Sequence, residues 1–165
     1  MDWVVFGVQW LHILLAILWF GNALAAAVVT IPAISKLPLV SQQAIGIQLG
    51  ERGGRMVDIV APLVILLGFV RGTILGPIKD AGVLFGTAYG LTWLVALVVA
   101  TATFLWGRYV IVPSTRALMS APVNPDGTPT PELDAGIERA KRVTVLELIG
   151  FLVVFTCMIL MRFGL

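Results

Sequence analysis

Four long apolar stretches constrain the fold of this chain more than any other feature. They cover about residues 3–34, 57–77, 83–112 and 143–161. A helix of roughly 20 apolar residues crosses the hydrocarbon core of a bilayer, so each stretch is long enough to span it. Only 12% of the residues are charged, about half the share found in soluble domains. We therefore predict an all-α fold, an integral membrane four-helix bundle with antiparallel, up-down topology in a single domain, 1–165.

The distribution of basic residues predicts the orientation of these spans. Eight of the 11 Lys and Arg residues lie in or beside the segments 35–56 and 113–142, and three lie on the other side. Because loops rich in Lys and Arg stay in the cytoplasm, we expect 35–56 and 113–142 to be cytoplasmic loops and both termini to face outward. The first stretch has no basic segment before it and is too long for a signal peptide, so we interpret it as a retained span.

Charge and cysteine content limit which partners and cross-links the chain is expected to have. The net charge of +2 is small and the basic residues are scattered, which argues against a nucleic-acid partner. The single cysteine, Cys157, excludes an intrachain disulfide. The bilayer is the expected partner, together with further copies of the chain or a larger membrane complex. The sequence contains no pattern typical of a hydrolytic triad, a phosphate-binding glycine loop or a zinc cage, and we expect no catalytic residues and no independent enzyme activity.

The only histidine, His12, is the principal candidate for a functional residue. It lies in the outer half of the first span, and the predicted topology brings five other candidate side chains to the same half: Arg71, Tyr89, Trp93, Met158 and Met161. A neutral imidazole there is able to ligate haem iron, copper or the magnesium of a chlorin, with a methionine as a second ligand to haem or copper. Arg71 is suited to hold an anionic group such as a propionate. The alternative is that His12 bonds to a neighbouring helix and the methionines fill space.

Charged side chains near the cytoplasmic ends of the spans form a second candidate cluster. Arg108 and Glu147 lie at matching depth on the third and fourth spans, and Asp58 lies at the same level on the second. We expect a structural ion pair between Arg108 and Glu147, joined by Asp58. The alternative is a proton or ion path through these groups, because charges at membrane depth are often functional.

Small residues predict close helix packing on two spans. Gly21 and Asn22 lead into an alanine-rich run, and Gly68, Gly72 and Gly76 recur every four residues. Glycine ridges of this spacing let helices approach closely, and an asparagine can bond across the contact. The partner of the first helix, another helix of this chain or another copy, stays open.

The cytoplasmic segments carry signals for helix starts and turns. Thr130, Pro131 and Glu132 predict that the last helix begins near Pro131, well before its apolar part. Prolines and an Asp-Gly pair between 113 and 130 predict turns. A weakly amphipathic run after Pro38 predicts a short helix at the membrane interface.

Several short motifs resemble a known family. They are Leu11-His12 followed after six residues by Trp19-Phe20-Gly21, then Arg55-Met56, Pro62 before Gly68, Tyr89-Gly90 and Met161-Arg162-Phe163. In this arrangement the chain resembles the bacterial four-helix families around copper resistance protein D and the HemJ-type protoporphyrinogen oxidases. The resemblance extends over most of the chain.

The resemblance implies a bacterial plasma (inner) membrane protein with a histidine of its first helix close to haem or copper. Of the family's polar residues only His12 carries over, and the position of a lysine common in the third helix falls near Ala96. These departures disfavour porphyrinogen oxidation and copper import and favour a haem-binding relative or a relative that has lost the chemistry. Haem b is the first cofactor expected, with copper second.

Three functions follow as hypotheses. The first is a small haem b- or metal-binding protein associated with electron transport through His12. The second is a non-catalytic accessory subunit of a larger respiratory or photosynthetic membrane complex. The third is a copper or small-molecule transporter.

Overall fold

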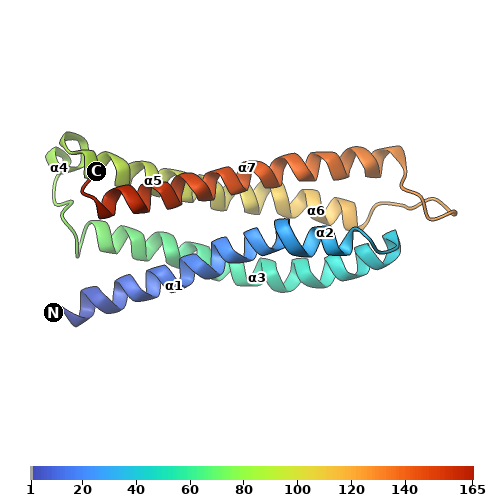
Figure 1. Ribbon diagram of the computed structural model, residues 1–165, viewed down its shortest axis with the longest axis horizontal. Helices are drawn as coiled ribbons and strands as arrows, with labels where there is room; N and C mark the ends of the chain where they lie inside the picture. The colour runs from blue at the N-terminus through green and yellow to red at the C-terminus, as the bar shows by residue number, and fades with distance from the viewer. Residues whose placement is uncertain (1) are drawn as a thin grey trace.

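The computed structural model describes residues 2–165, which form long helices packed side by side (Figure 1). In chain order the elements are α1 Trp3–Ala25, the π-helical segment η1 Ala26–Thr30, α2 Ile31–Ile34, α3 Leu39–Gly72, α4 Ala81–Gly86, α5 Ala88–Trp106, the π-helical segment η2 Gly107–Ile111, α6 Val112–Met119 and α7 Pro131–Arg162. The described residues contain no strand, and one isolated β-bridge pairs Val123 with Pro129.

Four continuous helical rods are long and apolar enough to cross a membrane. They are Trp3–Ile34, Leu39–Gly72, Ala88–Met119 and Pro131–Arg162. The prediction of an all-α, multi-pass membrane protein with four spans is therefore confirmed at this level.

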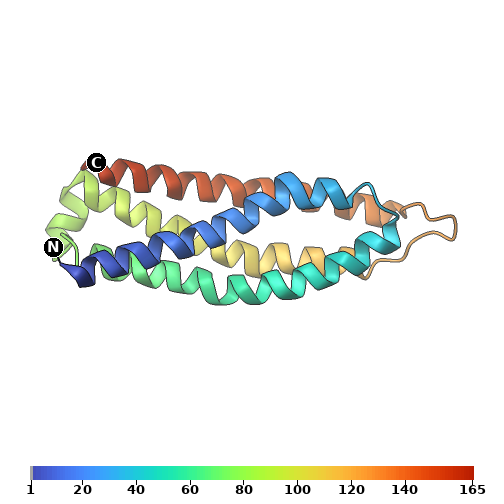
Figure 2. The ribbon, with the colours of Figure 1, turned by 60° about the horizontal axis from the view of Figure 1, so that its bottom comes forward.

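The rods form two hairpins, α1 with α3 and α5 with α7 (Figures 1 and 2). Both termini and the connection that contains α4 lie at one end of the bundle, which we call the terminal end. The connections 35–38 and 120–130 lie at the opposite end, the loop end.

An aromatic core joins the two hairpins near the middle. The Trp19 ring of α1 meets the Phe151 ring of α7 edge to face, with centroids 5.0 Å apart, and the Phe20 ring stacks on Phe151 at 5.2 Å. Val60, Ala61 and Val64 of α3 complete this buried cluster. Such aromatic pairs contribute about 0.5–1.5 kcal/mol each beyond their buried area.

The helices extend well beyond the apolar stretches. α3 has 34 residues, about 51 Å at 1.5 Å per residue, against a hydrocarbon core of about 30 Å. The segment 35–56, expected as a loop with a short interfacial helix, is helical from Leu39 onward. It is held by α6, since the Gln43 amide nitrogen donates to the carbonyls of Leu118 and Ala121 at 3.1 and 2.8 Å. The expected interfacial helix is thus the first part of α3.

Three further boundaries differ from expectation and one agrees. The second helix ends at Gly72 instead of near residue 77, and the third begins at Ala88 instead of residue 83. The third rod also continues to Met119 instead of ending near residue 112, so the first part of the expected loop 113–142 is helical. Thr87 causes the later start, because its backbone is extended and its hydroxyl accepts the Gly90 N–H at 2.9 Å as an N-cap. The start of α7 at Pro131 is confirmed, with the Thr130 hydroxyl accepting the Leu133 N–H at 3.3 Å.

The two hairpins share one irregularity in their first rods. η1 is followed directly by Ile31-Pro32, and η2 is followed directly by Val112-Pro113. In each case the residue before the proline donates its N–H five residues back, to Ala26 or Gly107. A proline cannot donate to the helical ladder, and the wider π turn lets the rod continue through it.

Candidate functional site

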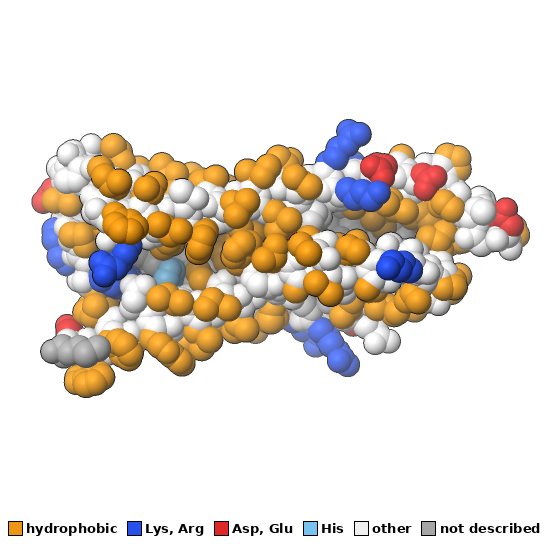
Figure 3. Space-filling model, in the orientation of Figure 1, with side chains coloured by type: hydrophobic (Ala, Val, Ile, Leu, Met, Phe, Trp, Pro, Cys, Tyr) orange, Lys and Arg blue, Asp and Glu red, His pale blue; other side chains and the backbone are white. Residues whose placement is uncertain are grey.

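His12 lies in a recess of the bundle toward the terminal end. Its side chain retains 6% of its accessible surface, and it is the pale blue group between apolar side chains in Figure 3. The Nδ1 atom lies 3.0 Å from the backbone carbonyl oxygen of Val64 on α3. The histidine therefore ties α1 to α3, as the structural alternative for this residue predicted.

The Val64 carbonyl is accessible because the residue one turn later is a glycine. In an α-helix the side chain of a residue covers the turn before its own Cα. A Cβ at Gly68 would lie 3.1 Å from the His12 Cε1 atom, tighter than ordinary contact. The predicted close approach at Gly68 is thus an approach of the His12 ring to the α3 backbone.

Trp93 repeats this arrangement from the other hairpin. Its Nε1–H donates to the Gly68 carbonyl at 3.3 Å, and a Cβ at Gly72, again one turn later, would overlap the indole ring. His12 and Trp93 therefore bind successive turns of α3 from two neighbouring helices. Gly68 and Gly72 expose the carbonyls that both rings use.

The bond to Val64 fixes the form of the His12 ring. A carbonyl only accepts, so Nδ1 carries the hydrogen and Nε2 keeps its lone pair. Within residues 2–165, Nε2 has no hydrogen-bond partner, and the one fully enclosed side-chain atom without a partner is Arg71 Nε. Nε2 is therefore not fully enclosed by the described residues. Metal-ligating histidines in proteins typically donate their other ring nitrogen to a carbonyl or carboxylate in this way.

Arg71 lies on the same face of α3, seven residues and about two turns beyond Val64. Its side chain is half-buried, and its Nη1 reaches only the Leu75 carbonyl, at 3.5 Å. The enclosed Nε lacks a partner among residues 2–165. A guanidinium with unused donors in an apolar surrounding favours an anionic partner.

Two of the remaining candidates lie on α7, at the same end. Met158 follows Phe151 by seven residues, and His12 precedes Trp19 by seven, so both lie about two turns from the Trp19–Phe151 contact toward the terminal end. α1 and α7 diverge there in both ribbon views, and Met158 is 38% exposed. Met161 is half-buried. The separation of the two helices keeps this end of α7 away from the His12 ring.

Tyr89 is half-buried on α5, one turn before Trp93. It forms no hydrogen bond with His12 or Arg71 in the described part of the chain. The structure thus brings His12 and Trp93 together on α3, with Arg71 on the next turns. Tyr89, Met158 and Met161 also lie toward the terminal end of the bundle, but within residues 2–165 they form no hydrogen bond with His12, Trp93 or Arg71.

The second candidate cluster has a different ion pair from the one expected. Arg108 Nε lies 3.5 Å from Asp58 Oδ1, and no salt bridge between Arg108 and Glu147 occurs in residues 2–165. Glu147 Oε1 instead lies beside Gly107, 3.1 Å from where a Cβ would be. The depths match, as predicted, but Arg108 lies on the α3 side of α5, on the helix face of Phe104, while Glu147 lies on α7. We call Asp58, Arg108 and Glu147 the charged layer.

Sequence reasoning missed the partners that are backbone atoms. The carbonyls of Val64 and Gly68 have no side-chain signature, and only the glycine spacing pointed to this part of α3. Asn22, expected to bond across a helix contact, is exposed. Within residues 2–165 no group of three or more His, Cys, Asp or Glu side chains is placed to hold a metal ion.

Comparison with known proteins adds no relative. No protein-family model, no curated protein and no solved structure matches this chain. The resemblance to the copper resistance protein D and HemJ-type families therefore stays a hypothesis that rests on the residues that suggested it.

Proposed function

We propose that this chain is a membrane protein that binds a b-type haem through His12. The observation that supports the proposal is the buried imidazole whose Nδ1–H is bonded to the Val64 carbonyl while its Nε2 has no hydrogen-bond partner among residues 2–165. This is the arrangement that orients a histidine as a ligand and raises its basicity.

A porphyrin suits this donor set better than a bare ion. One imidazole is a sparse site for copper, which favours several nitrogen or sulfur ligands. Haem brings four nitrogen ligands of its own and needs one axial residue. Arg71 would hold an acidic group of the cofactor with its unused donors, and His12 would hold the iron. Bound haem would supply one-electron transfer.

The absorption spectrum of the purified protein, with pyridine haemochrome analysis after expression with ample haem, tests the proposal. We expect a Soret band in the wild type and its loss in His12→Asn and His12→Ala. His12→Asn is the sharper variant, because its amide is able to donate to Val64 while it removes the ligand nitrogen. If the wild type has no Soret band, or if His12→Asn keeps it, the haem proposal is wrong.

We also propose that the four rods cross a bacterial inner membrane in alternating directions with both termini outside. The support is the excess of Lys and Arg toward the loop end. In a Cys157→Ser background, a cysteine at Asp2 should react with an impermeant maleimide in intact cells, and a cysteine at Asp126 should react only after lysis. The reverse pattern would invert the orientation.

A second candidate function is that of a non-catalytic subunit of a larger membrane complex. The exposure of α1 favours this function, because only 6% of the most apolar part of the first rod is buried against the rest of the chain, and Asn22 is exposed. Polar side chains on a span are commonly bonded to another helix. Cross-linking from position 22 in native membranes should then yield a discrete larger partner, and products of random size would argue against it.

A further inference from the structure

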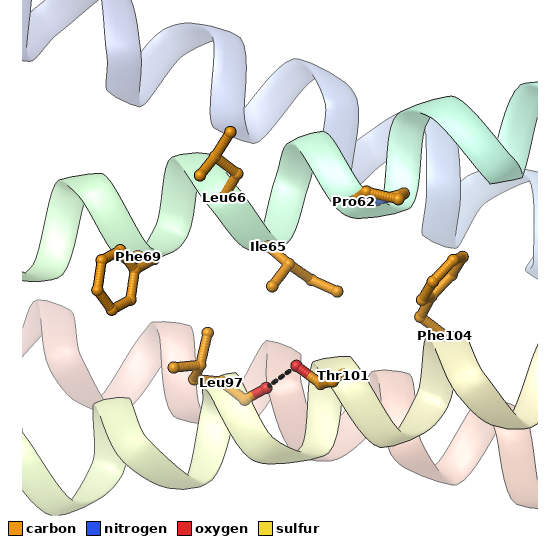
Figure 4. A pocket seen from close by; sticks show the side chains of 7 residues that line it. All are labelled: Pro62, Ile65, Leu66, Phe69, Leu97, Thr101 and Phe104. Atoms are coloured by element: carbon orange, nitrogen blue, oxygen red, sulfur yellow. Dashed lines mark hydrogen bonds between the residues drawn. The ribbon is translucent and has the colours of Figure 1, made fainter.

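An apolar groove lies between α3 and α5, on a face of α3 away from His12. It has a volume of about 440 Å³ and is lined mainly by Pro62, Ile65 and Phe69 of α3 and Leu97, Thr101 and Phe104 of α5. Figure 4 shows Pro62 and Phe104 at one end, Phe69 and Leu97 toward the other, and Ile65 and Thr101 between them.

The lining of the groove excludes a polar occupant. Thr101 contributes its only hydroxyl, and this hydroxyl already donates to the Leu97 carbonyl at 2.8 Å. A water or headgroup inside the groove would find no side-chain donor and only the acceptor lone pairs of this one hydroxyl, so burying its other polar groups there costs free energy. The groove therefore suits a hydrocarbon chain.

The depth of the groove matches one leaflet of a bilayer. Two polar contacts of α3 lie at the ends of the groove, the Trp93–Gly68 bond with α5 toward the terminal end and the Arg108–Asp58 pair with η2 toward the loop end. Phe69 follows Pro62 by seven residues along α3, a rise of about 10 Å. A leaflet contributes about half of the 30 Å hydrocarbon core, so a chain that lies along the groove stays within it.

A charged side chain marks the end of the groove where a headgroup would lie. Arg108 follows Phe104 by one turn, and Asp58 precedes Pro62 by one turn. The Arg108 side chain is 44% exposed, and among residues 2–165 only its Nε takes part in an ion pair, with Asp58. Its two terminal amino groups are free for a phosphate, which arginine binds with paired donors. The next residue, Tyr109, is 72% exposed, as is typical of aromatic residues at headgroup level.

We propose that the α3–α5 groove is a phospholipid-binding site, in which one acyl chain lies between Phe104 and Phe69 and the phosphate of an anionic lipid is bound by Arg108. Asp58 orients the guanidinium through Nε and leaves the terminal amino groups to the lipid. The site shares no residue with the proposed haem site, so each stands without the other.

Native mass spectrometry of the purified full chain with added dioleoyl phosphatidylglycerol or dioleoyl phosphatidylcholine tests the acyl-chain contact. We expect one retained phosphatidylglycerol per chain in the wild type. Leu97→Trp should fill the groove and abolish retention, whereas Val98→Trp, a matched change on the exposed neighbouring position, should not. Thr101→Phe, with Ala102→Phe as its control, repeats the comparison if Leu97→Trp does not fold. Equal retention by the filled and the control variants would overturn the proposal.

The double variant Arg108→Gln, Asp58→Asn tests the phosphate contact without leaving an unpaired charge. It should lower phosphatidylglycerol binding about fivefold, the equivalent of about 1 kcal/mol for one arginine near a headgroup. Phosphatidylcholine binding should fall by less, because its choline group offsets the charge of the same phosphate. Unchanged binding of phosphatidylglycerol would show that Arg108 does not hold the phosphate. A wild-type dimer that Leu97→Trp dissociates would show that a second copy fills the groove, and it would also overturn the proposal.

Discussion

Replacing Gly72 by alanine places a methyl group where the Trp93 indole lies, and its cost follows from the packing. Forcing extra volume into a packed site costs about 1–3 kcal/mol. Displacing the indole weakens its bond to the Gly68 carbonyl, which contributes about 0.5–1.5 kcal/mol. Alanine regains up to about 1 kcal/mol of helix propensity. With that gain counted in full, we expect Gly72→Ala to lower the free energy of unfolding by about 0.5–3.5 kcal/mol.

Two other glycines of α3 provide matched controls. Gly50 has no atom within 4 Å of a Cβ, and a Cβ at Gly68 would lie 3.1 Å from His12. Gly50→Ala should therefore raise the stability by up to about 1 kcal/mol, and Gly68→Ala should fall between the other two variants. Unfolding of each variant in mixed micelles with rising dodecyl sulfate measures the order. If Gly72→Ala is as stable as Gly50→Ala, Trp93 does not pack on Gly72 as argued.

Two further predictions concern charged groups. Asp58→Asn should lower the free energy of unfolding by up to about 1 kcal/mol, and by less at high salt, because the ion pair of Asp58 with Arg108 is half-exposed. Glu147→Gln should lower it by less in the same assay, because Glu147 forms no salt bridge in residues 2–165. The opposite ranking would indicate an ion pair between Arg108 and Glu147. In the turn at the loop end, the Thr128 hydroxyl and N–H donate to Asp126 and lower the pKa of that carboxyl. The turn should keep this stabilisation above the ordinary pKa of about 3.9 and lose it as the pH falls through the lowered pKa, and Thr128→Ala should raise the pKa of Asp126 in an NMR titration. An unchanged pKa would show that the hydroxyl bond to Asp126 does not form in solution.

The charged layer illustrates how far sequence reasoning reached. Depth could be predicted, because residue counts from the span ends place Asp58, Arg108 and Glu147 at one level. The direction in which each side chain points around its helix could not be predicted. η2 widens the turn at Arg108, and the pairing with Asp58 instead of Glu147 depends on how α5 is rotated between α3 and α7.

The sequence by itself determined the number of the spans, the start of α7 at Pro131, and His12 as the one histidine in an apolar helix. Hydropathy, length and capping are local properties of the chain, and they were sufficient to predict these features. Only the tertiary structure decided that His12 and Trp93 bind successive carbonyls of α3, and that a groove opens between α3 and α5. A membrane span is apolar on its lipid-facing and its buried sides alike, so its sequence carries little periodic signal for which face meets which neighbour.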